Sequence, residues 1–572
     1  MHDLKLRIAD IVSRHLVTRG VPEADIDILS LFKRPEKESF GDLSLPCFPF
    51  ARYLKLAPPA IATELAPLLN QVPGVSQVDV VGGYLNVHVD KFALFRAMWE
   101  RYQASPEAFF HRDTLRDRTM TVEFSSPNIA KPFSIGHLRS TVIGNFLQNL
   151  MKSSGARVIA INHLGDWGTQ FGKLIVAFNR WGDESALAAG AVDHLLELYV
   201  RFHDEAETSP ELEDEARNAF RKLEAGNQTE TALWDHFRQL SLDEFNRVYD
   251  RLNVSFDHYL GEAFYRDQLD GVLDRLTKTG LLTESQNAMV VNLDDHDMPP
   301  CLIQKSDGAS LYATRDIAAA IYRHETFHFD QSLYIVGAEQ SLHFRQFFKV
   351  LELAGYEWAT GMEHIPFGLY RFKDGKMSTR KGKVVFLEDV LNEAVSRVMA
   401  IMEAKNPDLN DAQRQEVAEI LGTSAIIFND LKNDRVKDIQ FDWDEVLNLE
   451  GDSGPYIAYS YVRCRGILDK AAGIPDELPD QVSEVVPGEV LLIQKLNQFE
   501  DVLDLCVRHR KSHFLAQYLL ELTRTFHGFY HHCRVVGDNM DTSAFRKALV
   551  RLTAATLKAG TGLMGMGLPE RM

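Results

Sequence analysis

The chain has 572 residues and a formal net charge of −19, with 45% hydrophobic and 25% charged residues. These proportions are ordinary for a soluble globular protein, and the length predicts three to five domains rather than one core. The acidic balance argues against a protein that binds polyanions over its whole surface, but it allows a local basic segment such as 371–383. No apolar run approaches the roughly 18 residues that a membrane helix needs, and five scattered cysteines without a C-x-x-C pair favour a reducing cytoplasm.

Residues 1–112 are predicted to form a separate α+β unit. Residues 1–16 have the spacing of an amphipathic helix and lack the uniform apolar core of a signal peptide. The segment 78–89 has the alternating pattern of a hairpin around Gly82 and Gly83.

The segment 121–162 has the pattern of a βαβ unit. Residues 121–124 alternate in polarity like a half-buried strand, an apolar repeat every four residues from Gly136 predicts a helix, and 157–162 is the next strand. The first loop of such a unit opens at the carboxyl end of the sheet, where these folds bind ligands, yet it has neither glycine-rich phosphate-binding pattern. The helix start at Gly136 and His137 offers free backbone N–H groups and a positive dipole end, which predicts an anion site. The alternative is that His137 only caps the helix.

The rest of the chain divides into a helical insertion, a second half of the sheet and a helical end. Residues 184–265 are acidic and helical, and strands are predicted to return at 333–338 and 366–372. From about residue 400 the chain is predicted to be nearly all helix. The apolar stripe through 492–506 predicts the core of a helical bundle, which an acidic, proline-containing loop interrupts at 473–488.

Three segments resemble the signature motifs of a known enzyme family. SSPNIAKPFSIGHLRST at 125–141 resembles the H-x-G-H motif of class I aminoacyl-tRNA synthetases, in the form found in arginyl-tRNA synthetases. NHLGDWGTQFGKL at 162–174 is similar to that family's segment after the second strand, and KMSTRKG at 376–382 to the second class motif, K-M-S-K-S. The motifs occur in the right order, and the resemblance extends over nearly the whole chain to the terminal LPERM.

Two positions depart from the class motifs. Ser134 replaces the first histidine and cannot carry a charge, and Thr379 replaces the second lysine. Arg380 and Lys381 follow Thr379 in the sequence. The resemblance implies that Lys131, just before the first motif, compensates for the missing lysine.

The resemblance implies an α/β catalytic domain with the Rossmann-type parallel sheet of class I synthetases, an N-terminal α+β domain and a C-terminal all-α helical bundle. The implied divisions are an additional tRNA-binding domain (1–112), the first half of the catalytic domain (113–183), a connective insertion (184–290), the second half with the KMSTRKG loop (291–400), a helical stem junction (401–450) and an anticodon-binding bundle (451–572).

The implied activity is that of an arginine–tRNA ligase. Such an enzyme activates L-arginine with ATP to arginyl-adenylate and transfers it to the 3′-terminal adenosine of tRNA(Arg), releasing AMP and pyrophosphate. The chemistry needs no general base, because an ionised carboxylate attacks the α-phosphorus and the barrier lies in orienting and stabilising anions. Mg²⁺ is expected to accompany ATP without a metal held by the protein, and the family implies a cytoplasmic monomer. The alternative, given Ser134 and Thr379, is a tRNA-binding paralogue without aminoacylation activity.

The resemblance also implies roles for single residues. The catalytic residues are His137, Lys131, Lys376, Ser378, Arg380 and Lys381. The arginine-binding residues are Glu123, Ser126, Asn128, His137, Tyr312, Asp316 and Gln340. The ATP-binding residues are Ser134, Gly136, His137, His163, Gly165, Asp166 and Lys376, and the tRNA-binding residues are Tyr84, Asn86, Tyr456, Tyr459, Tyr461 and Tyr530. Planar acceptors suit a guanidinium, and Tyr312 and Asp316 are four residues apart on one helix face. The simpler alternatives are an ion pair with an arginine for Glu123, a pair with Arg315 or Arg323 for Asp316, and core packing for the tyrosines.

Two histidine-containing segments are not predicted to bind metal. HETFH at 324–328 matches the H-E-x-x-H zinc motif, but it ends the predicted helix and runs directly into the strand at 332–336. HHC at 531–533 cannot place three side chains on one helix face, so packing is the expectation.

Overall fold

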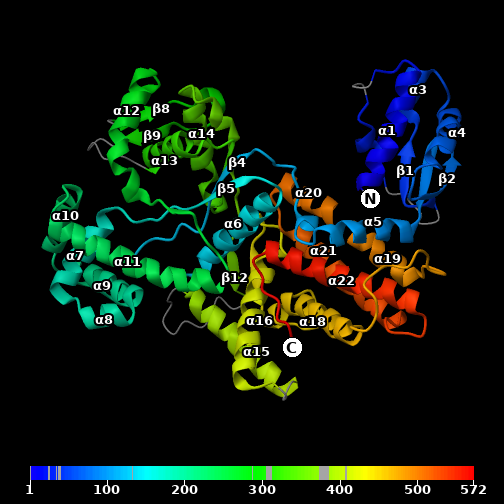
Figure 1. Ribbon diagram of the computed structural model, residues 1–572. Helices are drawn as coiled ribbons and strands as arrows, with labels where there is room; N and C mark the ends of the chain where they lie inside the picture. Colours follow the sequence, from blue (N-terminus) through cyan, green and yellow to red (C-terminus); the bar gives the residue numbers. More distant parts are fainter. Residues whose placement is uncertain are drawn as a thin grey trace. The chain divides into compact units, whose positions relative to one another are not determined.

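The computed structural model describes residues 2–22, 26–33, 35, 40–131, 133–286, 288–304, 312–372, 385–405 and 409–572. The chain forms two compact units, each made of segments that are distant in the sequence. Figure 1 colours the chain by residue number, from blue at the N-terminus to red at the C-terminus. The first unit combines Met1–Phe110 with Arg463–Asp504 and Tyr518–Leu557, and the second combines His111–Val462 with Leu505–Gln517 and Lys558–Met572.

The N-terminal part of the first unit is an antiparallel sheet with helices, as predicted. Its strands are β1 (Leu43–Pro46), β2 (Val75–Val81) and β3 (Tyr84–Val89), in the order β1-β3-β2, and its helices are α1 (His2–Thr18), α2 (Ile28–Leu31), α3 (Phe48–Leu54), α4 (Pro58–Leu69) and α5 (Lys91–Ala104). The predicted hairpin is confirmed, because Val81 pairs with Tyr84 across Gly82 and Gly83. Gly82 has a φ of +58°, and a Cβ on Gly83 would lie 2.7 Å from Pro58, so a side chain is unfavourable at both positions.

The second unit is built around a five-stranded parallel sheet, which confirms the predicted βαβ unit. Strands β4 (Thr119–Glu123), β5 (Arg157–Asn162), β6 (His258–Tyr259), β10 (Gln331–Tyr334) and β11 (Met362–His364) lie in the order β11-β10-β4-β5-β6, and all pairings are parallel. The helices that connect these strands include α6 (Ile135–Ser153), between β4 and β5, α13 (Tyr312–Phe327), before β10, and α14 (Ser341–Leu353), between β10 and β11. The strand order reverses between β4 and β10, and ligands bind beyond the carboxyl ends of the strands at such a switch point.

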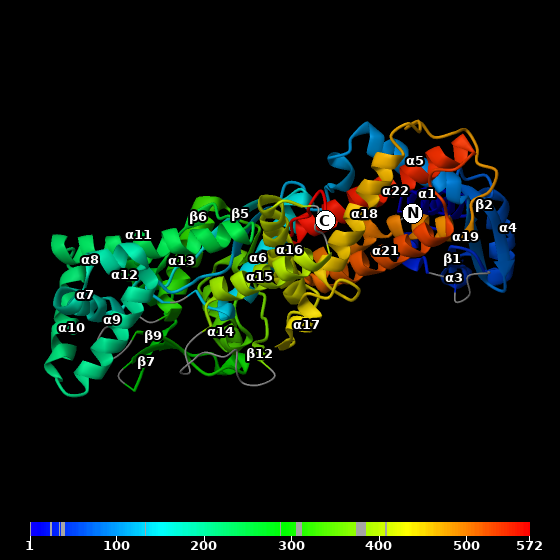
Figure 2. The same cartoon turned by 90° about the horizontal axis from the view of Figure 1, so that it is seen from below.

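Two insertions extend from this sheet. Helices α7 (Thr169–Trp181), α8 (Glu184–Ala189), α9 (Ala191–Ala206), α10 (Glu211–Glu224) and α11 (Gln228–Arg251) separate β5 from β6 and gather into one bundle (Figure 2). The predicted helical insertion is therefore confirmed, although its helices end at Arg251. Helix α12 (Leu269–Lys278) and an antiparallel sheet of β7 (Leu282–Ser285), β8 (Ala288–Val291) and β9 (Cys301–Gln304) follow β6.

The prediction that 366–372 forms a strand of the main parallel sheet is wrong. Strand β12 (Tyr370–Phe372) lies outside the five-stranded sheet and pairs in parallel with β13 (Ile439–Phe441). The edge position of the main sheet belongs to β11, which the sequence analysis did not find. Pro366 follows β11 closely, and because proline has no N–H it cannot continue the ladder.

From about residue 400 the described chain is mostly helical, as predicted, with β13 and several loops between the helices. The helices are α15 (Leu387–Lys405), α16 (Asp411–Leu431), α17 (Trp443–Val446), α18 (Gly454–Lys470), α19 (Pro487–Leu496), α20 (Phe499–His509), α21 (His513–His532) and α22 (Met540–Leu563). The predicted core stripe is confirmed, since Leu492, Leu496, Phe499, Leu503 and Cys506 are all buried. None of the helices in the described part of the chain is long and apolar enough to span a membrane.

Candidate active site

The loop after β4 holds three residues other than glycine in the left-handed region. Ser125, Ser126 and Ala130 have φ values of +70°, +49° and +59°. Such conformations cost on the order of 1–3 kcal/mol each and persist only where the surroundings enforce them. The Ser125 N–H donates to the Ser140 hydroxyl at 2.9 Å, which ties the loop to α6. The Ser126 hydroxyl is buried without a hydrogen-bond partner among the described residues, so it is available to a ligand.

Direct hydrogen bonds join this loop to the loop after β5. The Gly165 N–H donates to the carbonyl of Pro127 at 3.0 Å, and the Ile129 N–H donates to the carbonyl of Gly165 at 3.1 Å. The Asn128 side chain covers Gly165, where a Cβ would lie 2.3 Å from Asn128 Oδ1. The structure therefore brings together two predicted residues, Asn128 and Gly165, and leaves no space for a side chain at 165.

His137 lies in the first turn of α6 and both caps the helix and presents a free nitrogen. The Ser134 N–H donates to His137 Nδ1 at 3.1 Å, and the Ser134 hydroxyl is 3.2 Å from the same atom. Since Nδ1 accepts, the hydrogen of the neutral ring is on Nε2, which has no partner among the described residues and can donate to a phosphate. Burial, together with the positive charge of Lys131, lowers the pKa of His137, so the ring is neutral at neutral pH.

Four predicted residues of the second motif, Lys376, Ser378, Arg380 and Lys381, lie outside the described residues. The chain that follows the motif is hydrogen-bonded to the start of α6. The Ile135 N–H donates to the carbonyl of Val385 at 3.0 Å, and the Leu387 N–H donates to the carbonyl of Phe133 at 2.9 Å. These bonds anchor one flank of the second motif beside the first.

Glu123 ends β4 and is 7% exposed. Its Oε2 forms an ion pair with Arg323 of α13, so the ion pair that was the alternative for this residue is present. Arg323 is itself 1% exposed, and its Nε donates to the Tyr265 hydroxyl at 3.3 Å. Its guanidinium also lies 5.7 Å from the ring centre of Tyr334 on β10. Arg323 thus fixes the Glu123 carboxylate among elements from three parts of the chain.

Asp316 has a partner that the sequence analysis did not foresee. Its Oδ2 lies 2.5 Å from Nε2 of His343 on α14, and the expected alternative partners, Arg315 and Arg323, bind other acids. Tyr312 begins α13 four residues earlier, as predicted, but its side chain lies outside the described residues. The predicted face of this helix therefore places Asp316 beside a histidine rather than an arginine.

Glu262 is a further acid at this edge that the sequence analysis missed. It pairs with Arg315 at 3.1 Å, and burial raises its pKa although the charge of Arg315 opposes that shift. Its charge also interacts with Asp316. Tyr334 interacts with both Glu123 and Asp316, so the three acids lie near one another. The only sequence signal was an acid just after a strand, and β6 has just two residues, too few to show a period.

Three other predicted residues have different surroundings. The Asp166 carboxylate accepts hydrogen bonds from Arg238 at 3.0 Å and from the Ala263 N–H at 2.9 Å, so it joins the helical insertion to the segment after β6. His163 Nδ1 donates to the Leu260 carbonyl at 2.9 Å. Gln340 ends a short 3₁₀ turn, Ala338–Gln340, after β10 and is exposed at the carboxyl edge of the sheet.

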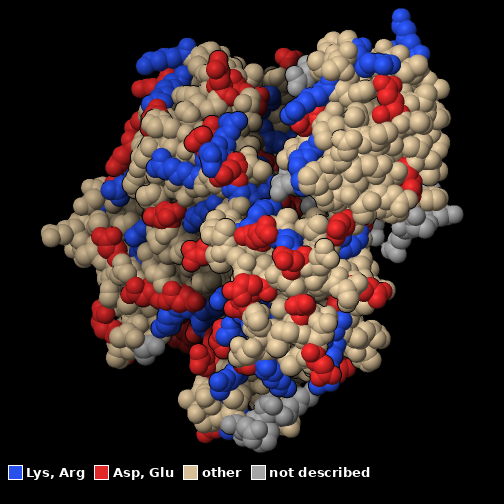
Figure 3. Space-filling view, turned by 45° about the vertical axis from the view of Figure 1, so that its right-hand side comes forward, with Lys and Arg blue, Asp and Glu red and all other residues tan. Residues whose placement is uncertain are grey.

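The residues predicted to bind tRNA divide by exposure. Tyr84, Tyr459 and Tyr530 are 42%, 40% and 44% exposed, and Tyr456 is half-buried, whereas Asn86 and Tyr461 are buried and not available to a base in this arrangement. Tyr84 packs edge-on against the exposed Phe48, and Arg463 lies 5.4 Å over the Tyr530 ring. Figure 3 shows acidic and basic side chains interspersed on one face, with a broad uncharged area over the N-terminal domain.

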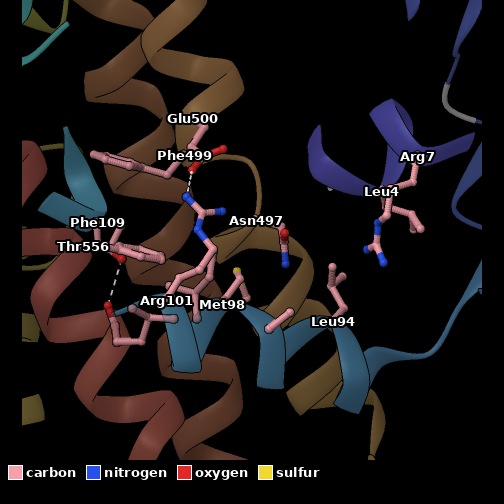
Figure 4. A pocket seen from close by; sticks show the side chains of 13 residues that line it. Leu4, Arg7, Leu94, Met98, Arg101, Phe109, Asn497, Phe499, Glu500 and Thr556 are labelled. Atoms are coloured by element: carbon pink, nitrogen blue, oxygen red, sulfur yellow. Dashed lines mark hydrogen bonds and ion pairs between the residues drawn. The ribbon is translucent and has the colours of Figure 1, made fainter. Parts of the chain in front are cut away.

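The cavity in Figure 4 is not part of this edge. It has a volume of about 60 Å³, lies within the first unit, and is lined by residues such as Arg7, Met98 and Asn497. Arg101 pairs with Glu500 across it at 2.8 Å. It contains none of the predicted site residues.

The histidines of HETFH do not form a metal site in this arrangement. His324 stacks on Trp358 at 4.7 Å, and α13 ends at Phe327, so His328 with its φ of +52° lies beyond the helix. Among the described residues no group of three or more His, Cys, Asp or Glu side chains could hold a metal ion.

The strand order, with its switch point between β4 and β10, and the helix-start donors beside it are those of an open parallel α/β sheet that binds a ligand beyond the carboxyl ends of its strands. Residues 106–443 match the class I (R) tRNA synthetase catalytic domain, residues 3–89 match the arginyl tRNA synthetase N-terminal domain, and residues 457–572 match the DALR anticodon binding domain. The chain belongs to the arginyl-tRNA synthetase family.

Individual relatives agree with that assignment. An arginine–tRNA ligase of Clostridium botulinum (strain Alaska E43 / Type E3) is 44% identical over 572 residues and covers all of both chains. An arginine–tRNA ligase of Exiguobacterium sibiricum is 46% identical over 547 residues, or 96% of each chain. The structure of Thermus thermophilus arginyl-tRNA synthetase superposes with a TM-score of 0.82 at 26% identity and covers 99% of this chain and 100% of that one. The expected family and fold class are confirmed.

Proposed function

We propose that this protein is an arginine–tRNA ligase that forms arginyl-adenylate from L-arginine and ATP and then esterifies the 3′-terminal adenosine of tRNA(Arg). The observation that carries the proposal is that the carboxyl ends of the sheet strands carry both a donor suited to an anion and acids suited to a cation. His137 supplies a neutral donor at the start of α6, the helix that follows β4, and Glu123 at the end of β4 belongs to a group of acids with Glu262 and Asp316. An anion and a planar cation are what such a pair of surfaces binds.

In the first step the arginine carboxylate attacks the α-phosphorus of ATP, and pyrophosphate leaves. His137 Nε2 and the N–H groups at the start of α6 stabilise the charge that develops on the phosphate oxygens. Asp316 binds the guanidinium, Glu123 contributes its second oxygen, and Ser126, Asn128 and Gln340 orient the α-amino and carboxylate end. Lys131 is exposed and replaces the missing second lysine of the second motif, in which Lys376, Ser378, Arg380 and Lys381 complete the charge stabilisation.

In the second step the ribose hydroxyl of tRNA attacks the carbonyl carbon of the adenylate, and AMP leaves. We assign residues 1–112 to the tRNA elbow and residues 451–572 to the anticodon. The exposed rings of Tyr84, Tyr459 and Tyr530 support these assignments, because unstacked bases bind to aromatic faces. ATP enters with Mg²⁺, and the working enzyme is a cytoplasmic monomer.

The decisive experiment is charging of total tRNA by the full-length protein with labelled L-arginine and MgATP. Labelled tRNA should form only when ATP is present, and unlabelled citrulline should not compete. ATP–pyrophosphate exchange with and without tRNA then shows whether tRNA completes the active site. Binding of tRNA without any charging would instead support the paralogue without aminoacylation activity.

A further inference from the structure

The acids at the sheet edge differ in the cations that they bind. Three of them bind arginine side chains: Glu123 with Arg323, Glu262 with Arg315 at 3.1 Å, and Asp166 with Arg238 at 3.0 Å. Asp316 instead binds His343, at 2.5 Å. A guanidinium keeps its charge at every physiological pH, whereas an imidazole loses its charge near neutrality. Of these four acids, Asp316 is therefore the one whose partner can give up its charge.

The pair is accessible to a small ligand. Helices α13 and α14, which carry the two residues, pack against each other (Figure 1). The side chains of His343 and Asp316 are 25% and 27% exposed, unlike Arg323 at 1%. The His343 ring packs against Phe347 at 5.5 Å between centres, which holds its Nε2 toward the carboxylate. A ligand can thus reach Asp316 without opening the core.

We propose that His343 is a proton-linked specificity residue for the amino acid substrate. It neutralises Asp316 in the empty site and loses its proton when the substrate guanidinium binds that carboxylate. This inference rests on the proposed function, in which Asp316 binds the guanidinium. Two cations cannot share one half-buried carboxylate without repelling each other, and the imidazolium is the one that can become neutral.

The other titratable groups around the pair do not provide an equivalent proton. His364 on β11 interacts electrostatically with His343. Burial lowers the pKa of His364, and its Nε2 donates to the Val336 carbonyl at 3.0 Å. Burial raises the pKa of Cys301 on β9 to about 12 and raises the pKa of Tyr334 on β10, so both stay protonated. Glu339, from the 3₁₀ turn before α14, is exposed, and it interacts electrostatically with His364.

The remaining charged groups on the elements around His343 are either exposed or paired with an opposite charge. They include Glu357 on the 3₁₀ turn Glu357–Gly361 and Arg345 on α14 itself. Further groups on these elements are half-buried and paired with a partner of opposite charge: Lys349 with Glu352 on α14, Glu363 of β11 with Arg510, and Arg315 of α13 with Glu262.

Glu262, whose pKa burial raises and whose charge interacts with Asp316, is held by Arg315 at 3.1 Å. We assign the exchangeable proton to His343 because it is the group in direct contact with Asp316.

The exchange favours a charged side chain over a neutral one of the same shape. Citrulline has a urea group in place of the guanidinium, so it cannot replace the positive charge of His343 on Asp316. It would have to break the ion pair and leave the carboxylate uncompensated, or bind without using Asp316 at all. His343 therefore adds to the discrimination that the acids provide directly.

The test is titration calorimetry of L-arginine into the full-length protein, in two buffers of different ionisation enthalpy at matched pH between 6 and 8. Arginine should release a fraction of a proton near pH 6 and almost none at pH 8. Because protons compete with the substrate, Kd should rise as pH falls, by up to about tenfold per pH unit below the titration of the histidine. In His343→Asn both the proton release and this pH dependence should disappear. His296→Asn, at an exposed histidine of the turn Asp294–His296, is the matched control and should behave like the unaltered protein.

An unchanged proton release in His343→Asn would overturn the proposal while leaving the proposed function intact, provided that tRNA charging at pH 8 is retained. Absence of arginine binding and of charging in the unaltered protein would overturn both. If His343→Asn does not fold, histidine ring signals of the unaltered protein in nuclear magnetic resonance decide the matter at pH 6. One ring should become neutral on addition of arginine and should not change on addition of citrulline, and no change with arginine would refute the exchange.

Discussion

The two sides of the proposed site, the one assigned to phosphate and the one assigned to the guanidinium, are held together in different ways. On the phosphate side, His137 contacts Ser134, three residues away, and the ring is neutral. On the guanidinium side, Glu123 contacts Arg323, 200 residues away, and both groups are charged and buried. A neutral donor can wait for an anion without a partner, whereas a buried carboxylate cannot remain unpaired. The side that binds a cation must therefore contain cations of its own before the substrate arrives.

The largest effect is expected from breaking the buried pair on the guanidinium side. Arg323→Met leaves Glu123 buried without a counter-ion, which should lower the free energy of unfolding of the second unit by about 3–5 kcal/mol in a urea titration. The double variant Arg323→Met, Glu123→Gln should recover part of this loss, because the uncompensated charge is removed. Equal stability of the two variants would show that packing, and not charge, dominates at Arg323.

On the phosphate side, His137→Ala should lower the rate of adenylate formation by about 10²–10³, which is typical for removal of one donor to a developing oxyanion. The arginine Kd should change little. The pKa of His137 is lowered, so in the unaltered protein the maximal rate should stay constant as pH falls from 8 through the usual histidine range. Rapid-quench measurements of single turnover at several pH values check both points. A rate that falls between pH 7 and 6 would contradict a neutral donor at this position.

Substitution of Asp316 should raise the KM for arginine and leave the KM for ATP nearly unchanged. Asp316→Asn should raise the KM for arginine by about 100-fold, because a charge-assisted bond to the guanidinium becomes a neutral one, and should leave the KM for ATP within about twofold. Steady-state charging with each substrate varied in turn separates the two constants. A similar rise in both would remove Asp316 from the arginine pocket.

The smallest effect is expected from relief of backbone strain at Ala130, in the loop between β4 and α6. Ala130→Gly replaces a left-handed alanine by the residue that adopts this conformation freely, and the gain is opposed by the greater entropy of glycine in the unfolded chain. We expect a change in unfolding free energy of no more than about 1 kcal/mol, in the stabilising direction, and charging within about twofold of normal. Ala156→Gly, at a buried alanine outside the left-handed region, is the control and should destabilise.

The same contrast explains what could be predicted from the sequence. The β4–loop–α6 segment and the hairpin at Gly82 and Gly83 rely on neighbours in the chain, so their patterns were sufficient. Glu262, Arg323 and His343 obtain their roles from segments that the sheet brings together, and no local period reveals such a meeting. For the same reason a strand was predicted at 366–372 in the main sheet, although the edge position belongs to the three residues of β11.

The hydrogen bond between Ser134 and His137 also decides what the ring excludes. A histidine that ligates a metal uses the lone pair of one nitrogen and donates the hydrogen of the other to an acceptor. Here the backbone N–H of Ser134 occupies the lone pair of Nδ1, so the outward nitrogen carries a hydrogen and has no lone pair to offer. Under the proposed function, a divalent ion that arrives with ATP would find no ligand in this atom and would coordinate phosphate oxygens on a side that the imidazole does not touch.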